Sequence, residues 1–225
     1  MLQEYVPIVV RVLITEILIA IHLKSVQIIP FSFCKFCNNV YFCRINLETD
    51  ICMAITSERL RQTFSEGGAQ EIYQEIKAEG DFLSFARRYV FDEDHRVARS
   101  ALWGLTKASN KEISELQALL NELINQSMQT ENSSLRRLTL SIIERLKMAE
   151  EDLRTDFLDF CFEHMVSMEE LPGTQTLCMK LAFRMCQFYP ELMDEFIRTI
   201  EAMEIDYYKP AVKGLRRKIM NGKLT

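Results

Sequence analysis

The chain has 225 residues, of which 48% are hydrophobic and 26% are charged, and its formal net charge is −5. Chains of ~100 to 200 residues usually form one domain, so these values fit a single globular or short repeat domain and exclude a fibrous or disordered protein. The acidic balance does not favour a dedicated nucleic-acid binder, because phosphate contacts need a basic face and usually a basic domain.

The first 52 residues differ in composition from the rest. They carry only eight charged residues but four of the seven cysteines. One hypothesis is a membrane anchor, because residues 6–23 are largely apolar. Arg11 and Glu16 interrupt this stretch, and each central charge costs about 2.5 to 3.5 kcal/mol on insertion scales. We therefore do not expect a membrane partner.

Two other hypotheses concern where the natural protein begins. A secretory signal is disfavoured because Glu4 is the first charge and no small-residue cleavage site follows the apolar stretch. The alternative that we favour is a natural start at Met53, with residues 1–52 translated from upstream sequence. This divides the chain into a doubtful N-terminal extension, residues 1–52, and a helical repeat domain, residues 53–225.

The cysteines fall into two groups. Cys34 and Cys37 form a CxxC pair, and Cys43 and Cys52 follow it. Four thiolates can form a closed zinc site, but such sites usually contain two closely spaced pairs, and we predict no metal or other cofactor. The remaining cysteines lie in amphipathic helical patterns, where the thiol behaves as a small buried hydrophobe: Cys161, Cys178 and Cys186. Seven cysteines without a disulfide framework indicate a reducing, cytoplasmic location.

The segment after residue 53 has helical periodicity throughout and no strand-like alternation. Two short helices over residues 57–66 and 69–79, with Gly67 and Gly68 in the turn between them, precede four helix pairs. Each pair has an outer and an inner helix. The expected pairs cover 81–91 with 93–108, 110–128 with 133–148, 151–168 with 173–188, and 190–203 with 206–221. Breaks fall at turn-forming residues such as Gly80 and at Pro190.

The inner helices repeat at a regular interval. With Val97 as the anchor, Leu135, Leu177 and Ala211 open the equivalent patterns at intervals of roughly 38, 42 and 34 residues. These intervals are typical of HEAT or armadillo hairpins. The predicted fold class is all-α, an α–α superhelix of about four HEAT-like helical hairpins.

One face of the inner helices carries cations and aromatic residues. A helix advances ~100° per residue, so Val97, Ala101 and Leu105 share a buried stripe, and Arg99 lies away from it. The repeat intervals place Met179 and several other residues on this second, concave face. The predicted partner-binding residues are Arg99, Trp103, Arg137, Phe183, Lys213 and Arg217.

The two aromatic residues have two interpretations. In the first interpretation, Trp103 and Phe183 pack between neighbouring hairpins, as large aromatic residues often do. In the other they anchor a partner, because tryptophan and arginine are enriched among binding hot spots. Residues 209–223 add six cations and no acid, which is either a local basic face or a solvated helix end.

No catalytic motif occurs in the chain. His164 lacks the second histidine that a zincin helix needs, His95 lies at a helix start, and nucleophile-elbow, phosphate-loop and dinucleotide-binding glycine patterns are absent. The acidic residues over 150–159 fit a solvated first turn of a helix. We therefore predict a non-enzymatic protein.

From about residue 78 to 224 the chain resembles short bacterial HEAT-like repeat proteins. The resemblance is carried by RVARSALWGL, SSLRRLTLSIIERL, LDFCFEHM and PAVKGLRRKI. It implies an α-solenoid without a catalytic motif. HEAT-like alkylpurine DNA glycosylases are other relatives, but they use a positive groove with an acidic catalytic residue, and no aspartate lies on the predicted concave face.

The function that we predict is protein interaction, with an acidic peptide or protein surface bound on the concave face. The alternative is a DNA-binding or alkylation-repair-related HEAT-like protein, in which the same residues contact phosphates. Salt titration distinguishes the two, because counterion release makes duplex affinity fall steeply with salt.

Overall fold

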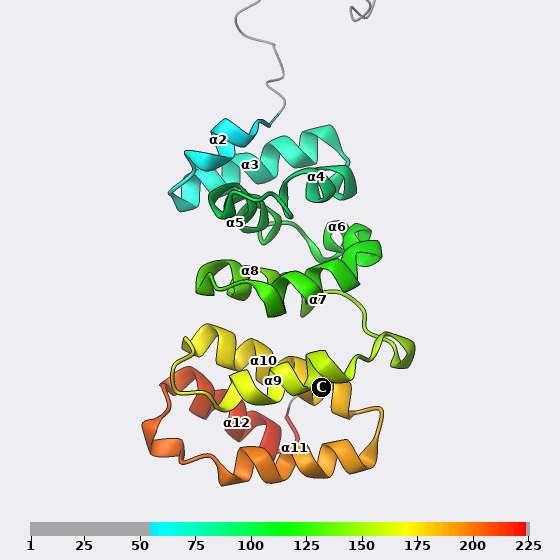
Figure 1. The fold of residues 1–225 in the computed structure, drawn as a ribbon, viewed down its shortest axis with the longest axis vertical. Helices are drawn as coiled ribbons and strands as arrows, with labels where there is room; N and C mark the ends of the chain where they lie inside the picture. Colours follow the sequence, from blue (N-terminus) through cyan, green and yellow to red (C-terminus); the bar gives the residue numbers. More distant parts are fainter. Residues whose placement is uncertain (1–54, 224–225) are drawn as a thin grey trace, which may run out of the picture. The chain divides into compact units, whose positions relative to one another are not determined.

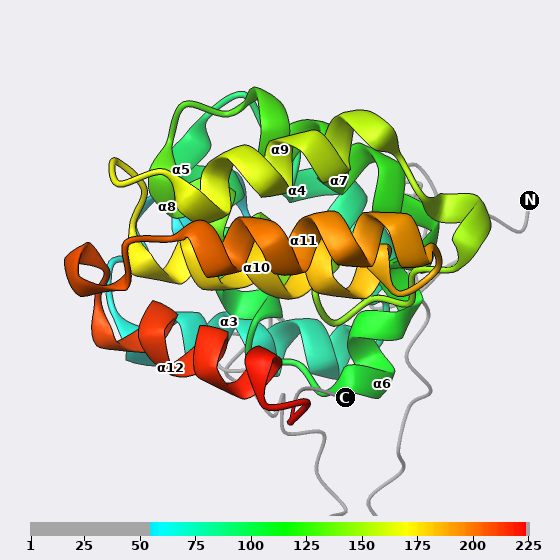
Figure 2. The same cartoon turned by 90° about the horizontal axis from the view of Figure 1, so that it is seen from below.

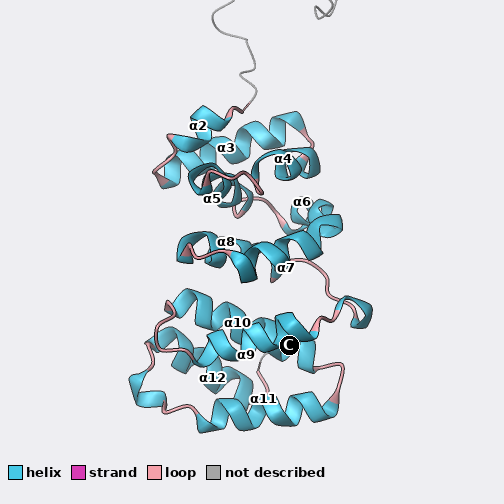
Figure 3. Ribbon diagram, viewed as in Figure 1, coloured by secondary structure: helices cyan, strands magenta, loops and turns pink. Residues whose placement is uncertain are grey.

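Residues 55–223 fold into helices joined by short loops (Figure 1). A computed structural model describes residues 55–223, and over this range it contains α-helices and short 3₁₀ helices but no strand (Figure 3). The predicted all-α superhelix is therefore confirmed. The hypotheses about a zinc site, an anchor and a start at Met53 concern residues outside the described range.

The helices have the following bounds. They are α2 (Ser57–Arg61), α3 (Glu66–Glu79), α4 (Phe82–Tyr89), α5 (His95–Leu105), α6 (Asn110–Ile113), η1 (Ser114–Leu119), α7 (Leu120–Gln129), α8 (Ser133–Ile143), η2 (Glu150–Asp152), α9 (Thr155–Val166), α10 (Pro172–Cys186), α11 (Pro190–Ala202), η3 (Ile205–Tyr207) and α12 (Pro210–Met220). Helices form in all segments of the four expected pairs, and the first three pairs pack as expected, whereas α11 and α12 both pack on α10. The second outer helix differs from the expectation, because a 3₁₀ segment interrupts it between α6 and α7.

Local chemistry explains where the helices start. The side chain of Asp94 caps α5 and that of Asn132 caps α8, each accepting hydrogen bonds from backbone N–H groups of the first turn. Proline occupies the first turn of α10, α11 and α12, where its missing N–H costs nothing. Aspartate, asparagine and proline in the sequence therefore mark these boundaries.

The expected turn at Gly67 and Gly68 is wrong. Both glycines lie in the first turn of α3, because the Ser65 hydroxyl accepts a hydrogen bond from the Gly68 N–H at 3.0 Å and caps the helix. A Cβ at Gly68 would lie 3.0 Å from the Thr63 side chain. The glycine therefore permits a close approach between the loop and α3.

The helices form two rows. In the inner row, α3, α5, α8, α10 and α12 pack on one another in that order. The outer helices α4, α7 and α9 pack on α5, α8 and α10, and α11 packs on α10, over which it lies in Figure 2. Buried apolar residues from all of these helices form one continuous core. No helix within residues 55–223 is both long enough and apolar enough to cross a bilayer.

The expected spacing between the second and third inner helices is wrong by three residues. Ala101, Thr139 and Cys178 are all fully buried, and they lie 38 and 39 residues apart, not 38 and 42. Met179 is also fully buried, which removes it from the predicted exposed face. Thr174 is therefore the structural equivalent of Leu135. The sequence favours Leu177 at the buried position because leucine is more hydrophobic than threonine, which explains the three-residue error.

Candidate functional site

Arg99 on α5 is half-buried and tied to the loop between α2 and α3. Its Nη2 donates to the Thr63 carbonyl oxygen at 3.1 Å, and its guanidinium carbon lies 6.0 Å from the centre of the Phe64 ring. The hydroxyl of Ser100 donates to the same carbonyl at 3.4 Å. Arg99 thus joins two parts of the fold, and only some of its five donors face outward.

Trp103 is half-buried and packs against the hydrophobic core. With intervals of 38 and 39 residues, its equivalents are Ser141 on α8 and Lys180 on α10, and these are half-buried too. The Lys180 Nζ lies 2.9 Å from Glu144 Oε1, an ion pair between neighbouring inner helices. The position of Trp103 is therefore occupied by polar residues in the two following helix pairs.

Arg137 on α8 is exposed. Its aliphatic stem lies against the start of α10, since a Cβ on Gly173 would lie 2.9 Å from Arg137 Cδ. Within residues 55–223 its guanidinium forms no ion pair. The aliphatic part of Arg137 thus packs on α10, and its guanidinium is exposed without an ion-pair partner in the described range.

Phe183 on α10 lies beside the next outer helix. Its ring centre is 5.9 Å from that of the fully buried Phe196, at an interplanar angle of 53°. In the corrected register Phe183 is equivalent to Glu144, whereas Lys180 is equivalent to Trp103. The structure therefore does not bring Phe183 into one row with Trp103.

The last inner helix carries Lys213 and Arg217. Lys213 Nζ donates to the Asp206 carbonyl oxygen at 3.3 Å, and Arg217 is exposed. Other exposed cations of this segment are Lys209, Lys218 and Lys223. We call the set Lys209, Arg217, Lys218 and Lys223 the basic end. None of its members forms an ion pair within the described range.

Two arginines that the sequence did not single out cap the preceding inner helices. Arg145 donates to the carbonyls of Thr106 at 3.3 Å and Ala108 at 2.5 Å. Arg184 donates to the carbonyls of Glu144 at 2.8 Å, Leu146 at 3.1 Å and Ile143 at 3.3 Å. We call Arg145 and Arg184 the capping arginines. Carbonyls at a helix C-terminus lack partners within the helix, so a cation there satisfies them and complements the dipole.

The regular spacing of the capping arginines in the sequence could have predicted them. Lys107, Arg145 and Arg184 occupy equivalent positions at intervals of 38 and 39 residues. Lys107 forms an ion pair with Glu66 instead of capping a helix. A basic residue thus recurs at the C-terminal end of α5, α8 and α10, within the last turn of α10 and just after the last residue of α5 and α8.

The family model of the HEAT repeat domain matches residues 56–223, which is most of the chain. The chain belongs to the HEAT repeat family. HEAT repeats generally mediate protein–protein interaction, and proteins of this family are typically non-enzymatic scaffolds. Neither a curated protein nor a solved structure matches the chain.

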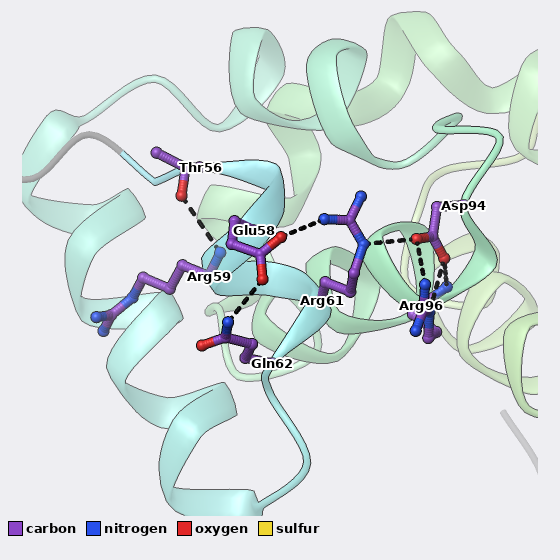
Figure 4. Close-up of polar contacts among 7 residues, drawn as sticks. All are labelled: Thr56, Glu58, Arg59, Arg61, Gln62, Asp94 and Arg96. Atoms are coloured by element: carbon purple, nitrogen blue, oxygen red, sulfur yellow. Dashed lines mark hydrogen bonds and ion pairs between the residues drawn. The ribbon is translucent and has the colours of Figure 1, made fainter.

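The N-terminal end of the HEAT domain carries an ion-pair cluster (Figure 4). Asp94 Oδ2 lies 2.8 Å from Arg61 Nε and 3.0 Å from Arg96 Nη2. Hydrogen bonds from Arg96 and Arg61 hold the pKa of the Asp94 carboxyl well below its usual range. The cluster ties α2 to the first turn of α5, and it occupies cations that would otherwise be available to a ligand.

A second polar cluster in the HEAT domain joins α8 to the loop after α9. Glu170 Oε1 lies 2.7 Å from Arg136 Nη1 and 2.8 Å from His164 Nδ1, and all three side chains are largely buried. Arg136 also lies 5.9 Å from the centre of the Phe160 ring. The contact with Glu170 gives His164 a structural role in this cluster.

The described part of the HEAT domain has no group of three or more side chains placed to hold a metal ion. Its three free cysteines are buried. Burial raises the pKa of the Cys186 thiol to about 11 and also raises that of Cys161. A buried thiol with a raised pKa is a poor nucleophile, because the thiolate is the reactive form.

Proposed function

We propose that the HEAT domain is a non-enzymatic interaction module that binds an acidic peptide or protein surface along the face of its inner row. The observation that carries this proposal is the exposure of Arg137 and Arg217, which have no ion-pair partner within residues 55–223. Uncompensated cations on one row of helices provide charge complementarity for an acidic ligand.

The other predicted contacts contribute in unequal ways. Trp103 supplies a half-buried aromatic surface on the inner helix α5, and tryptophan is enriched among binding hot spots. Arg99 and Lys213 each use a donor within the fold, and Arg99 Nε is also buried, so only part of the Arg99 guanidinium is open to a ligand. Phe183 contributes an apolar edge at most, because its ring already packs on Phe196.

The test is affinity capture of partners from the native cell with the parent and with Arg137→Glu. Arg137 is a better position for this test than Arg99, because the Arg99 side chain holds Thr63 in place. The matched control is Arg87→Glu, which reverses an exposed arginine on the outer helix α4. We expect the parent and the control to retain an acidic partner that Arg137→Glu loses. Equal retention by all three proteins would refute the proposal.

Duplex DNA is the alternative ligand, and the basic end favours it. Residues 209–223 contain six cations and no acid. If this segment contacts phosphates, the affinity for a random duplex falls steeply with salt, by about 0.9 in the logarithmic slope for each phosphate neutralised. A shallow slope with weak duplex binding supports the acidic protein partner.

A further inference from the structure

A cavity of about 520 Å³ opens at the C-terminal ends of α9 and α11. Its walls are mainly apolar and come from segments distant in the sequence: Val166 and Met168 from the first, and Ala202, Met203, Tyr207 and Tyr208 from the second. We call it the C-terminal pocket. Its volume lies within the ~300 to 1,000 Å³ that is usual for ligand pockets.

The pocket has a fixed wall and an exposed apolar rim. The Tyr208 hydroxyl donates to the Val166 carbonyl oxygen at 2.7 Å, which ties the segment after α11 to the end of α9. Met168 is 57% exposed and Tyr207 is 69% exposed. Two large apolar side chains displayed at the rim of one cavity are characteristic of a binding surface.

One carboxylate lies in the pocket wall, and two more belong to residues next to the lining residues in the sequence. Glu204 lies in the wall, and together with burial it raises the pKa of the Tyr208 hydroxyl. Glu169 follows Met168 in the chain, and Asp206 precedes Tyr207; both are exposed. Within the described part of the chain, none of these three carboxylates forms an ion pair. Glu204 therefore places a carboxylate without an ion-pair partner in the described range beside an apolar cavity. Asp206 differs, because Lys213 Nζ already reaches its carbonyl oxygen at 3.3 Å.

We propose that the C-terminal pocket binds a basic segment of a partner protein, which inserts one large apolar side chain and places a flanking lysine or arginine against Glu204 in the wall. Charge complementarity selects this occupant, because an acidic or purely apolar segment would leave Glu204 next to like charge or without a partner. The inserted side chain would be the hot spot, and the ion pairs would set orientation and specificity.

The lining of this site shares no residue with the acidic-ligand face of the inner row. It comes from the end of α9, from α11 and from the segment after α11, and Lys213 of the acidic-ligand face reaches the Asp206 carbonyl oxygen in that segment. The proposal does not depend on the proposed function, and the two sites prefer ligands of opposite charge. The domain would thereby connect two different partners.

The experiment is selection of random displayed peptides on the full-length chain, followed by binding of synthesised hits measured by fluorescence anisotropy. We expect hits that share one large apolar residue flanked by lysine or arginine. Hits that are acidic, that lack an apolar residue, or that fail to appear at all overturn the proposal.

The variants locate the binding site. Glu204→Lys reverses the wall charge, and Ala202→Trp fills the cavity from an exposed position on α11. We expect each to weaken the hits at least tenfold, with unchanged helicity by circular dichroism. Glu131→Lys, an exposed acid in the loop before α8, is the matched control and should bind like the parent. Equal binding by parent, Glu204→Lys and Ala202→Trp overturns the assignment.

Discussion

The cations at the ends of the middle inner helices and those on α12 have different surroundings. Arg145 and Arg184 donate to main-chain carbonyls of the preceding inner helix, and burial lowers the pKa of both guanidinium groups. The exposed side chains of Arg217 and Lys218 have no ion-pair partner in the described range. The same residue types thus hold the middle pairs together and remain available at the end.

This difference follows from the geometry of the stack. A middle inner helix has a neighbour on each side, so a cation at its C-terminal end can reach the C-terminal carbonyls of the helix before it. On α12, Arg217 and Lys218 are exposed, whereas Arg216 reaches the Ile200 carbonyl at the end of α11 and Lys213 reaches the Asp206 carbonyl. A cation in a repeat protein therefore indicates binding only after its main-chain contacts are known.

The largest expected effect separates two positions on α8. Leu135 is buried in the core and Arg137 is exposed two residues later. Leu135→Ala should lower the free energy of unfolding by about 2 to 5 kcal/mol, because it removes buried methyl groups and leaves a cavity. Arg137→Ala should change it by no more than about 0.5 kcal/mol. Urea unfolding measures both, and reversed effects would show that the row assignment is wrong.

The next largest effect compares how much a capping arginine and a cation of the basic end contribute to the free energy of unfolding. Arg184→Ala should lower the free energy of unfolding by about 1.5 to 3 kcal/mol, since hydrogen bonds to charged groups contribute about that much and three carbonyls lose their donor. Lys218→Ala, an exposed cation on α12, should have little effect. Equal destabilisation in thermal melts would remove the distinction between capping and free cations.

Trp103→Ala tests whether the half-buried aromatic contributes to binding. Truncation at a hot spot costs ~2 kcal/mol or more in binding free energy. We expect this loss for a captured acidic partner, measured by isothermal titration calorimetry with a variant whose helicity is intact. A full-strength complex would mean that Trp103 only packs between hairpins.

The smallest effect concerns pH and the Asp94 cluster. The folded state holds the pKa of Asp94 below its unfolded value of about 4, so this carboxylate stabilises the fold above that pH. Its contribution should be lost as the pH falls through the folded pKa. Unfolding measured against pH for the parent and Asp94→Asn should show a difference that shrinks in acid. A difference that is constant with pH would contradict this.

The sequence predicted the helices and their two rows because apolar periodicity and capping residues are local signals. The register of the third pair was predicted wrongly, since Leu177 reads as a better anchor than Thr174, although the structure buries Thr174 completely. The functional cations could not be separated from structural ones, because Arg137 and Arg145 lie on the same helix pair and differ only in what their side chains reach. The C-terminal pocket was not predicted because its walls come from two distant segments.

Trp103 provides the most direct measurement, because it is the only tryptophan in the chain and its fluorescence reports on one position of the inner row. The measurement is titration of the full chain with an acidic glutamate-rich peptide, repeated for Arg137→Glu and for the outer-helix control Arg87→Glu. We expect a saturable change in emission for the parent and the control, and none for Arg137→Glu. An unchanged emission in the parent, or the same change in Arg137→Glu, would contradict binding of an acidic ligand along the inner row.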